Sequence, residues 1–159
     1  MIVVAAGMRD WPDKQHVFDE LDLLFVEHCT DWCAKRDLAL DRPLHANVKK
    51  QMHEAFVLRH GVSGNVDFAA NDWGLKRGVT IERFPAEWRD PITNAFQPWA
   101  GPRRNELMAS KEPRADLWLA FWDGKFQQRG GKKVSGTFDG ICVSLKYGLN
   151  VAIKPPRGK

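Results

Sequence analysis

The 159-residue sequence has only three cysteines, no long apolar run and no glycine-rich nucleotide signature. An odd number of cysteines without paired spacing argues against a disulfide framework. No stretch of about 18 apolar residues occurs, so we expect no transmembrane helix. The first residues lack the basic and apolar regions of a signal peptide, which predicts a cytoplasmic protein. The chain also lacks the P-loop consensus and the G-x-G-x-x-G fingerprint, which excludes these two phosphate-binding loops.

Metals and cofactors are not expected either. His28, Cys29 and Cys33 lie close together in the sequence, but their spacing differs from that of zinc ligands and no second Cys/His pair follows. The formal net charge of +4 favours an anionic partner without identifying one. Most basic residues are scattered, except in the tract 129–133 and at the C-terminal end.

Short apolar runs alternate with helical segments along the chain. The predicted strands cover residues 2–6, 54–60, 79–84, 115–122 and 149–153. The first predicted helix covers 14–28, with Asp13 as its cap, and a short helix is expected near 46–53. Further predicted helices begin after the loop near 65, near Pro102 and at Gly136 or Thr137. This alternation predicts an α/β fold, a Rossmann-like three-layer sandwich with a mostly parallel sheet of about five strands. We expect a single domain over 1–159, with insertions near 29–53 and 125–135.

Glycine-containing loops follow the predicted strands at 7–11, 60–67 and 122–137, and another covers 98–105. In an open parallel sheet, such loops meet at the carboxyl edge, where ligands bind at the switch in strand order. Three of the loops lead into helix N-termini, whose unpaired N–H groups and dipole favour phosphate. The pattern therefore predicts an anion-binding site at this edge.

The loop motifs resemble the YspA/YpsA-related branch of the SLOG superfamily, which is named after the DprA/Smf and LOG proteins. The matching segments are Gly7-Met8-Arg9-Asp10-Trp11, His60–Asp67, Arg83–Trp88, Gly101–Asn105, Phe121–Gly124 and Gly136–Asp139. The resemblance covers nearly the whole chain except 29–53 and 125–135. It implies a Rossmann-like domain that binds nucleotides or nucleotide-derived signals, and it also implies a homo-oligomer.

The predicted ligand site combines loop glycines with polar and aromatic side chains. The expected ligand-binding residues are Gly7, Arg9, Gly61, Gly64, Asp67, Gly101, Arg104, Asn105, Trp122, Gly136 and Thr137. Thr137, together with the amides near Gly136, is the leading phosphate site, and a simple N-cap is the alternative role of Thr137.

Four of the other residues also have a structural alternative. Arg9 pairs either with a phosphate or with a surface carboxylate. Asn105 contacts a ribose or base edge, or it braces a loop. Asp67 binds a ribose hydroxyl, or it complements the dipole of its helix. Trp122 stacks on a base, or it packs in the core.

Three functions fit these patterns. The first is a sensor or sequestering module for a nucleotide-derived small molecule. The second is a nucleoside 5′-monophosphate phosphoribohydrolase, as the LOG relatives are, with Asp139 as the catalytic carboxylate, although their Pro-Gly-Gly-x-Gly-Thr loop is not intact here. The third, single-stranded nucleic-acid binding, ranks last because basic and aromatic residues are not interleaved along one stretch. The basic loop 123–135 is expected to be a mobile lid over an anionic ligand.

Overall fold

The computed structural model describes residues 1–39 and 41–158; Leu40, which falls in the predicted insertion 29–53, and Lys159 lie outside the described residues. The elements are β1 (Ile2–Gly7), α1 (Lys14–Ala34), α2 (Ala46–Glu54), β2 (Val57–His60), α3 (Asn65–Arg77), β3 (Thr80–Arg83), α4 (Ala100–Ser110), β4 (Leu117–Phe121), β5 (Gln127–Arg129), β6 (Lys132–Val134), α5 (Gly136–Lys146) and β7 (Asn150–Lys154). The five predicted strands of the central sheet are all present: β2, β3 and β4 are shorter than predicted, β1 is one residue longer, and β7 is shifted by one residue.

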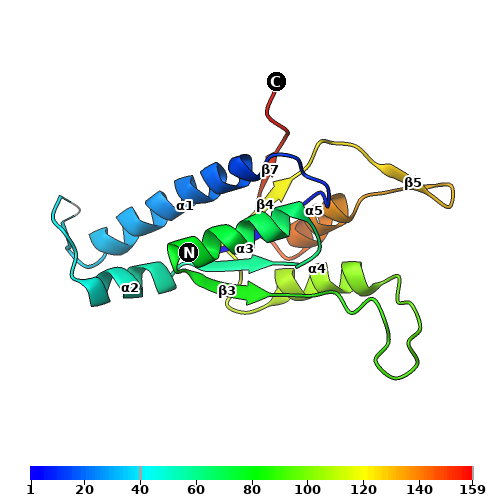
Figure 1. Ribbon diagram of the computed structural model, residues 1–159, viewed down its shortest axis with the longest axis horizontal. Helices are drawn as coiled ribbons and strands as arrows, with labels where there is room; N and C mark the ends of the chain where they lie inside the picture. Colours follow the sequence, from blue (N-terminus) through cyan, green and yellow to red (C-terminus); the bar gives the residue numbers. More distant parts are fainter. Residues whose placement is uncertain (40, 159) are drawn as a thin grey trace.

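The central sheet has five parallel strands in the order β3-β2-β1-β4-β7 (Figure 1). From β1 the chain steps outward through β2 to β3, and it then crosses to the other side of β1 to form β4 and β7. The strand order therefore reverses between β1 and β4, which is the switch point of an open α/β sheet. The predicted α/β, Rossmann-like three-layer sandwich is confirmed.

Strand β1 shows how the sequence builds both outer layers. Successive side chains of a strand point to opposite faces. Val3 and Ala5 belong to the core cluster that contains residues of α1 and α3, whereas Val4 packs with residues of α4 and α5. Because helices cover both faces, β1 is apolar at nearly every position, as expected for a strand of a buried parallel sheet.

Helix α1 begins where the sequence predicts but extends beyond the predicted end at residue 28. The side chain of Asp13 caps it by accepting a hydrogen bond from the His16 amide, at 2.8 Å. Trp32 and Cys33 lengthen the buried face because they pack against Met52 of α2. Residues 29–34 therefore continue the helix beyond its predicted end. No helix in the described part of the chain is long and apolar enough to cross a membrane.

The predicted loop 123–135 contains an antiparallel hairpin, formed by β5 and β6. Gly130 and Gly131 make its turn with φ of 56° and 76°, values that glycine adopts without strain. Phe126, at the base of the hairpin, packs on Trp122 and Phe138 with ring centroids 5.4 and 5.1 Å away. The hairpin extends as an arm away from the helical layers (Figure 1). A simple loop was therefore the wrong prediction for this segment.

Candidate functional site

Arg104 extends from α4 to the loop that follows β2. Its Nη1 donates to the carbonyl of Gly61 at 3.1 Å, while Nε and Nη2 donate to Oδ1 of Asn105 at 3.3 and 3.2 Å. A Cβ on Gly61 would lie only 2.6 Å from Nη1, so a larger residue here would displace the guanidinium from its present position. Burial lowers the pKa of Arg104; the nearby charges of Asp67 and Asp139 oppose this effect, and the charge of Arg9 adds to it. Arg104 forms no ion pair with any described carboxylate, so its direct partners are neutral.

Asn105, in the second turn of α4, connects this helix to the first turn of α5. The side chain is 3% exposed. Its Nδ2 donates to Asp139 Oδ2 at 2.9 Å and to the Gly136 carbonyl at 3.3 Å, and its Oδ1 accepts from Arg104. Both Nδ2 and Oδ1 of Asn105 thus have partners within the protein. This is the arrangement expected if Asn105 braces a loop. Through them Asn105 orients Arg104 on one side and Asp139 on the other.

Asp67, in the first turn of α3, holds the loop under Arg104. The carboxylate is buried and accepts hydrogen bonds from the Gly61 amide (3.1 Å), the Ser63 amide (2.8 Å) and the Ser63 hydroxyl (2.9 Å). Three donors from one loop thus converge on this carboxylate. Asp67 therefore fixes the loop whose Gly61 carbonyl receives Arg104.

Two glycines let the loops after β1 and β2 pack closely. A Cβ on Gly64 would lie 2.5 Å from the Cα of Arg9, and the Asn65 amide donates to the Arg9 carbonyl at 2.8 Å. A Cβ on Gly7 would lie 2.6 Å from Val66. The side chain of Arg9 is exposed and forms neither a hydrogen bond nor an ion pair with the residues that the structure describes. The surface salt bridge that was the alternative role for Arg9 is therefore absent among the described residues.

Gly101 lies at the start of α4, beneath an aromatic ring. A Cβ there would lie 3.0 Å from the indole of Trp88, which itself stacks on Phe96 with ring centroids 6.0 Å apart. The absence of a side chain at Gly101 thus lets Trp88, from the segment 85–99, pack against the start of α4. This contact gives Gly101 a packing role next to Arg104.

The first turn of α5 is capped by Ser135, whose Oγ accepts from the Phe138 amide at 3.2 Å. Thr137 is therefore not the N-cap of the helix. Thr137 is only 8% exposed, yet its hydroxyl has no hydrogen-bond partner among the described residues. The amides of Gly136 and Thr137 have no acceptor inside the helix, because they lie in its first turn. One hydroxyl and two N–H groups are thus available to an anion at this point.

Trp122 and Asp139 flank this helix start. The indole of Trp122 donates to the Lys125 carbonyl at 3.1 Å and packs on Phe126 and Phe138, which is the packing alternative predicted for this residue. Asp139 is half-buried, and Asn105 donates its only side-chain hydrogen bond within the described residues. The second carboxylate oxygen of Asp139 has no such partner.

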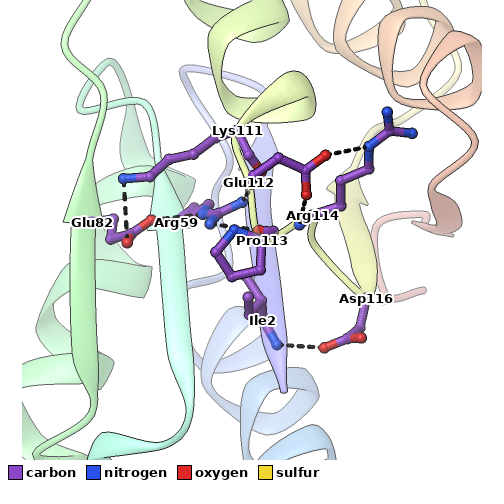
Figure 2. A network of polar contacts seen from close by, with 8 residues as sticks. All are labelled: Ile2, Arg59, Glu82, Lys111, Glu112, Pro113, Arg114 and Asp116. Carbon is purple, nitrogen blue, oxygen red and sulfur yellow. Dashed lines mark hydrogen bonds and ion pairs between the residues drawn. The ribbon is translucent and has the colours of Figure 1, made fainter.

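A buried ion pair between Arg59 of β2 and Glu82 of β3 was not predicted from the sequence. Arg59 of β2 is fully buried and donates from Nε to Glu82 Oε2 at 2.6 Å, from Nη1 to the Lys111 carbonyl at 3.2 Å and from Nη2 to the Pro113 carbonyl at 2.9 Å (Figure 2). Lys111 Nζ lies 3.3 Å from Glu82 Oε1. The network ties β2 and β3 to the segment that leads into β4. The available signal was a lone arginine inside an apolar strand.

The candidate metal ligands at the end of α1 make core contacts instead. The His28 imidazole contacts the Met52 carbonyl at 2.9 Å, and Cys33 Sγ lies 3.6 Å from Met52 Sδ. Throughout residues 1–39 and 41–158, no three His, Cys, Asp or Glu side chains are grouped as metal ligands would be.

No protein-family model matches the chain, and no curated protein matches it. Membership of the SLOG branch therefore stays a prediction, which depends on the sequence motifs alone. The protein is a Rossmann-like α/β domain. Arg9, Arg104 and the first turn of α5 lie at the carboxyl ends of its parallel strands.

Proposed function

We propose that the protein binds a phosphate-bearing nucleotide or nucleotide derivative at the carboxyl edge of its sheet, as a sensor or sequestering module. The observation that carries the proposal is the state of Arg104. Its guanidinium is largely withdrawn from water, yet its direct partners are a carbonyl and an amide oxygen. Burial of a charge is costly unless an opposite charge pairs with it. A phosphate would supply that charge, in the bidentate geometry that a guanidinium favours.

Arg9 supports the same assignment. Its exposed guanidinium has no carboxylate partner among the described residues, and its charge acts on Arg104 at this edge, beside the opposing charges of Asp67 and Asp139. A bound anion would add to the attraction that these two carboxylates exert on the two cations. The amides of Gly136 and Thr137, at a helix start on the same side of the sheet, are suited to phosphate as well.

The nucleotide part of the proposal rests on two further arguments. Open α/β sheets bind their ligands at the switch in strand order, which here lies between β1 and β4. The motifs that resemble the SLOG branch follow these same strands, and the resemblance implies a nucleotide-derived ligand.

Binding without turnover is favoured over glycosidic cleavage by the state of the carboxylates. Glycoside hydrolysis commonly uses two carboxyl groups. Asp139 keeps one oxygen without a described partner, but Asp67 already accepts three hydrogen bonds from its own loop. Asp139 is thus the one predicted site carboxylate with spare hydrogen-bonding capacity.

Calorimetric titration of the full chain against matched nucleosides, nucleoside monophosphates, ADP-ribose and inorganic phosphate tests the proposal. A nucleotide should bind about ten- to a hundred-fold more tightly than its nucleoside, because charge-assisted hydrogen bonds contribute about 1.5–3 kcal/mol. Equal affinities for nucleoside and nucleotide would refute the phosphate assignment.

Chromatography of the same mixtures separates binding from hydrolysis. We expect no free base after prolonged incubation with monophosphates. Release of free base by the wild type, lost in Asp139→Asn, would replace the binding module with a phosphoribohydrolase. The asparagine variant keeps an oxygen in place to accept the hydrogen bond from Asn105.

A further inference from the structure

The net positive charge of the protein is concentrated in the hairpin arm, defined here as residues 124–135. The arm contains Lys125, Arg129, Lys132 and Lys133 and no acidic residue. These four cations equal the formal net charge of +4, so the rest of the chain carries as many acidic as basic side chains. The electrostatic attraction of the protein for a polyanion therefore originates in this arm.

The arm holds its charges in an arrangement that is costly without a counterion. Arg129 is paired directly with Lys132 across the hairpin, and like charges in such positions destabilise a strand pair. Neither side chain forms an ion pair with a described residue, and Lys133 also forms none. Lys125 has one carboxylate nearby, Asp123, at 3.9 Å. All four side chains are exposed.

Aromatic side chains lie at the base of the arm. Phe126 and Phe138 have ring centroids 5.1 Å apart and remain 40% and 39% exposed, while both pack on Trp122. Phe138, in the first turn of α5, follows the arm closely in the sequence, and the fold returns it to the base of the hairpin beside Phe126. The four cations and the two exposed aromatic rings are thereby brought together in space.

We propose that the hairpin arm binds single-stranded nucleic acid, with the four cations on successive phosphates and Phe126 and Phe138 stacked on bases. Proteins that bind single strands combine a basic track with aromatic platforms in this way. The exposed rings favour a single strand over a duplex, whose bases already stack on each other. This function is separate from the binding of a mononucleotide at the carboxyl edge, and it does not depend on it.

The proposal is tested by fluorescence anisotropy with a labelled oligothymidine of about 16 nucleotides. Binding through four phosphates should weaken by about 50-fold between 50 and 200 mM salt. Replacement of Lys125, Arg129, Lys132 and Lys133 by glutamine should remove this salt dependence and most of the affinity. Unchanged binding by this variant, or no binding by the wild type at 50 mM salt, would overturn the proposal.

A matched control removes the same number and kind of charges elsewhere. Lys35, Arg42, Lys49 and Lys76 are exposed and lie on or near α1, α2 and α3, so their replacement by glutamine produces the same net charge. The control variant should bind oligothymidine like the wild type. An equal loss in both variants would show that net charge alone attracts the strand, and the arm would not be the site.

Further probes separate the other anionic partners. A duplex of the same length, or vesicles with anionic lipid, bound as tightly as oligothymidine would overturn the assignment to single strands. The glutamine variant of the arm should bind a nucleoside monophosphate as the wild type does. A loss there, with oligothymidine binding intact, would instead make the arm the lid that sequence analysis predicts.

The aromatic contribution has a different signature. Phe126→Leu keeps an apolar side chain against Trp122 but removes the stacking ring. It should lower the affinity for oligothymidine by about five-fold or more at both salt concentrations, because stacking does not release counterions. Unchanged affinity, with an unchanged thermal unfolding midpoint, would exclude Phe126 from base contact.

Discussion

Two buried or half-buried arginines of this protein, Arg59 and Arg104, have opposite kinds of partners. Arg59 pairs with the Glu82 carboxylate at 2.6 Å and donates to two carbonyls. Among the described residues, Arg104 donates only to the Gly61 carbonyl and the Asn105 amide oxygen. The first guanidinium thus has a carboxylate in direct contact, whereas the second has none.

The positions of the two arginines match this difference. Arg59 joins β2 and β3 to the segment before β4 (Figure 2). Arg104 lies against the loop at the end of β2, on the side of the sheet where open α/β folds bind ligands. Arg59 thus has a structural role, whereas Arg104 is the residue that we propose as the anion contact.

The largest expected effect is the loss of folding stability when Arg59 is replaced. Arg59→Met should lower the free energy of unfolding by about 3–5 kcal/mol, because it leaves the partly buried Glu82 carboxylate with only the more exposed Lys111 and removes the donors to the Lys111 and Pro113 carbonyls. Urea denaturation measures the change. Arg114→Met, which removes an exposed pair with Glu112, is the control and should cost under about 1 kcal/mol. Similar losses in both variants would contradict a special role for Arg59.

A smaller effect should depend on pH. Burial raises the pKa of Glu82, but its hydrogen bonds and attraction to Arg59 and Lys111 outweigh this, so its pKa lies below the ordinary value. The pair therefore stabilises the fold above about pH 4.5, and this contribution is lost as the pH falls further. Glu82→Gln should cost about 1.5–3 kcal/mol at pH 7.

The same variant should approach the stability of the wild type as the pH falls below the lowered pKa of Glu82. Urea denaturation at several pH values checks this convergence. A constant difference between the two proteins from pH 7 to pH 3 would contradict the ionised pair.

The smallest effect on stability is expected at Thr137. Thr137→Val keeps the shape of the side chain and removes a hydroxyl without a partner in the described structure, so the free energy of unfolding should change by under about 0.5 kcal/mol. Nucleotide affinity should nevertheless fall about ten-fold if the hydroxyl donates to a phosphate. Calorimetry on the folded variant measures this. A destabilised variant with full affinity would assign Thr137 to the core.

Local patterns predicted most of the central fold. The continuous apolar run at residues 2–6 and the Asp13 cap are short-range signals, and they identified β1 and the start of α1 correctly. The end of α1 was missed because Trp32 and Cys33 are buried by α2, a contact between separate segments. The hairpin was missed because its strands are too short and polar to show a strand pattern.

The sequence indicated where the site residues lie, but not which hydrogen-bond partners they have. Strand ends and glycines placed Arg104, Asn105 and Asp139 at one edge, and the structure joins them by hydrogen bonds. No local pattern could indicate that Asp67 is occupied by its own loop or that Ser135, rather than Thr137, caps α5. Hydrogen-bond partners depend on geometry between segments, which a single sequence does not contain.

The central claim, that Arg104 keeps its charge for an anionic ligand, is tested most directly by one pair of titrations. Arg104→Met and Arg103→Met, neighbours on α4, remove the same charge, but Arg103 is exposed and forms no ion pair with described residues. The account predicts that Arg104→Met lowers the calorimetric affinity for a nucleoside monophosphate by about ten- to a hundred-fold. It also predicts that Arg103→Met leaves this affinity unchanged and that both proteins stay folded. Equal affinities in the two folded variants would contradict the claim.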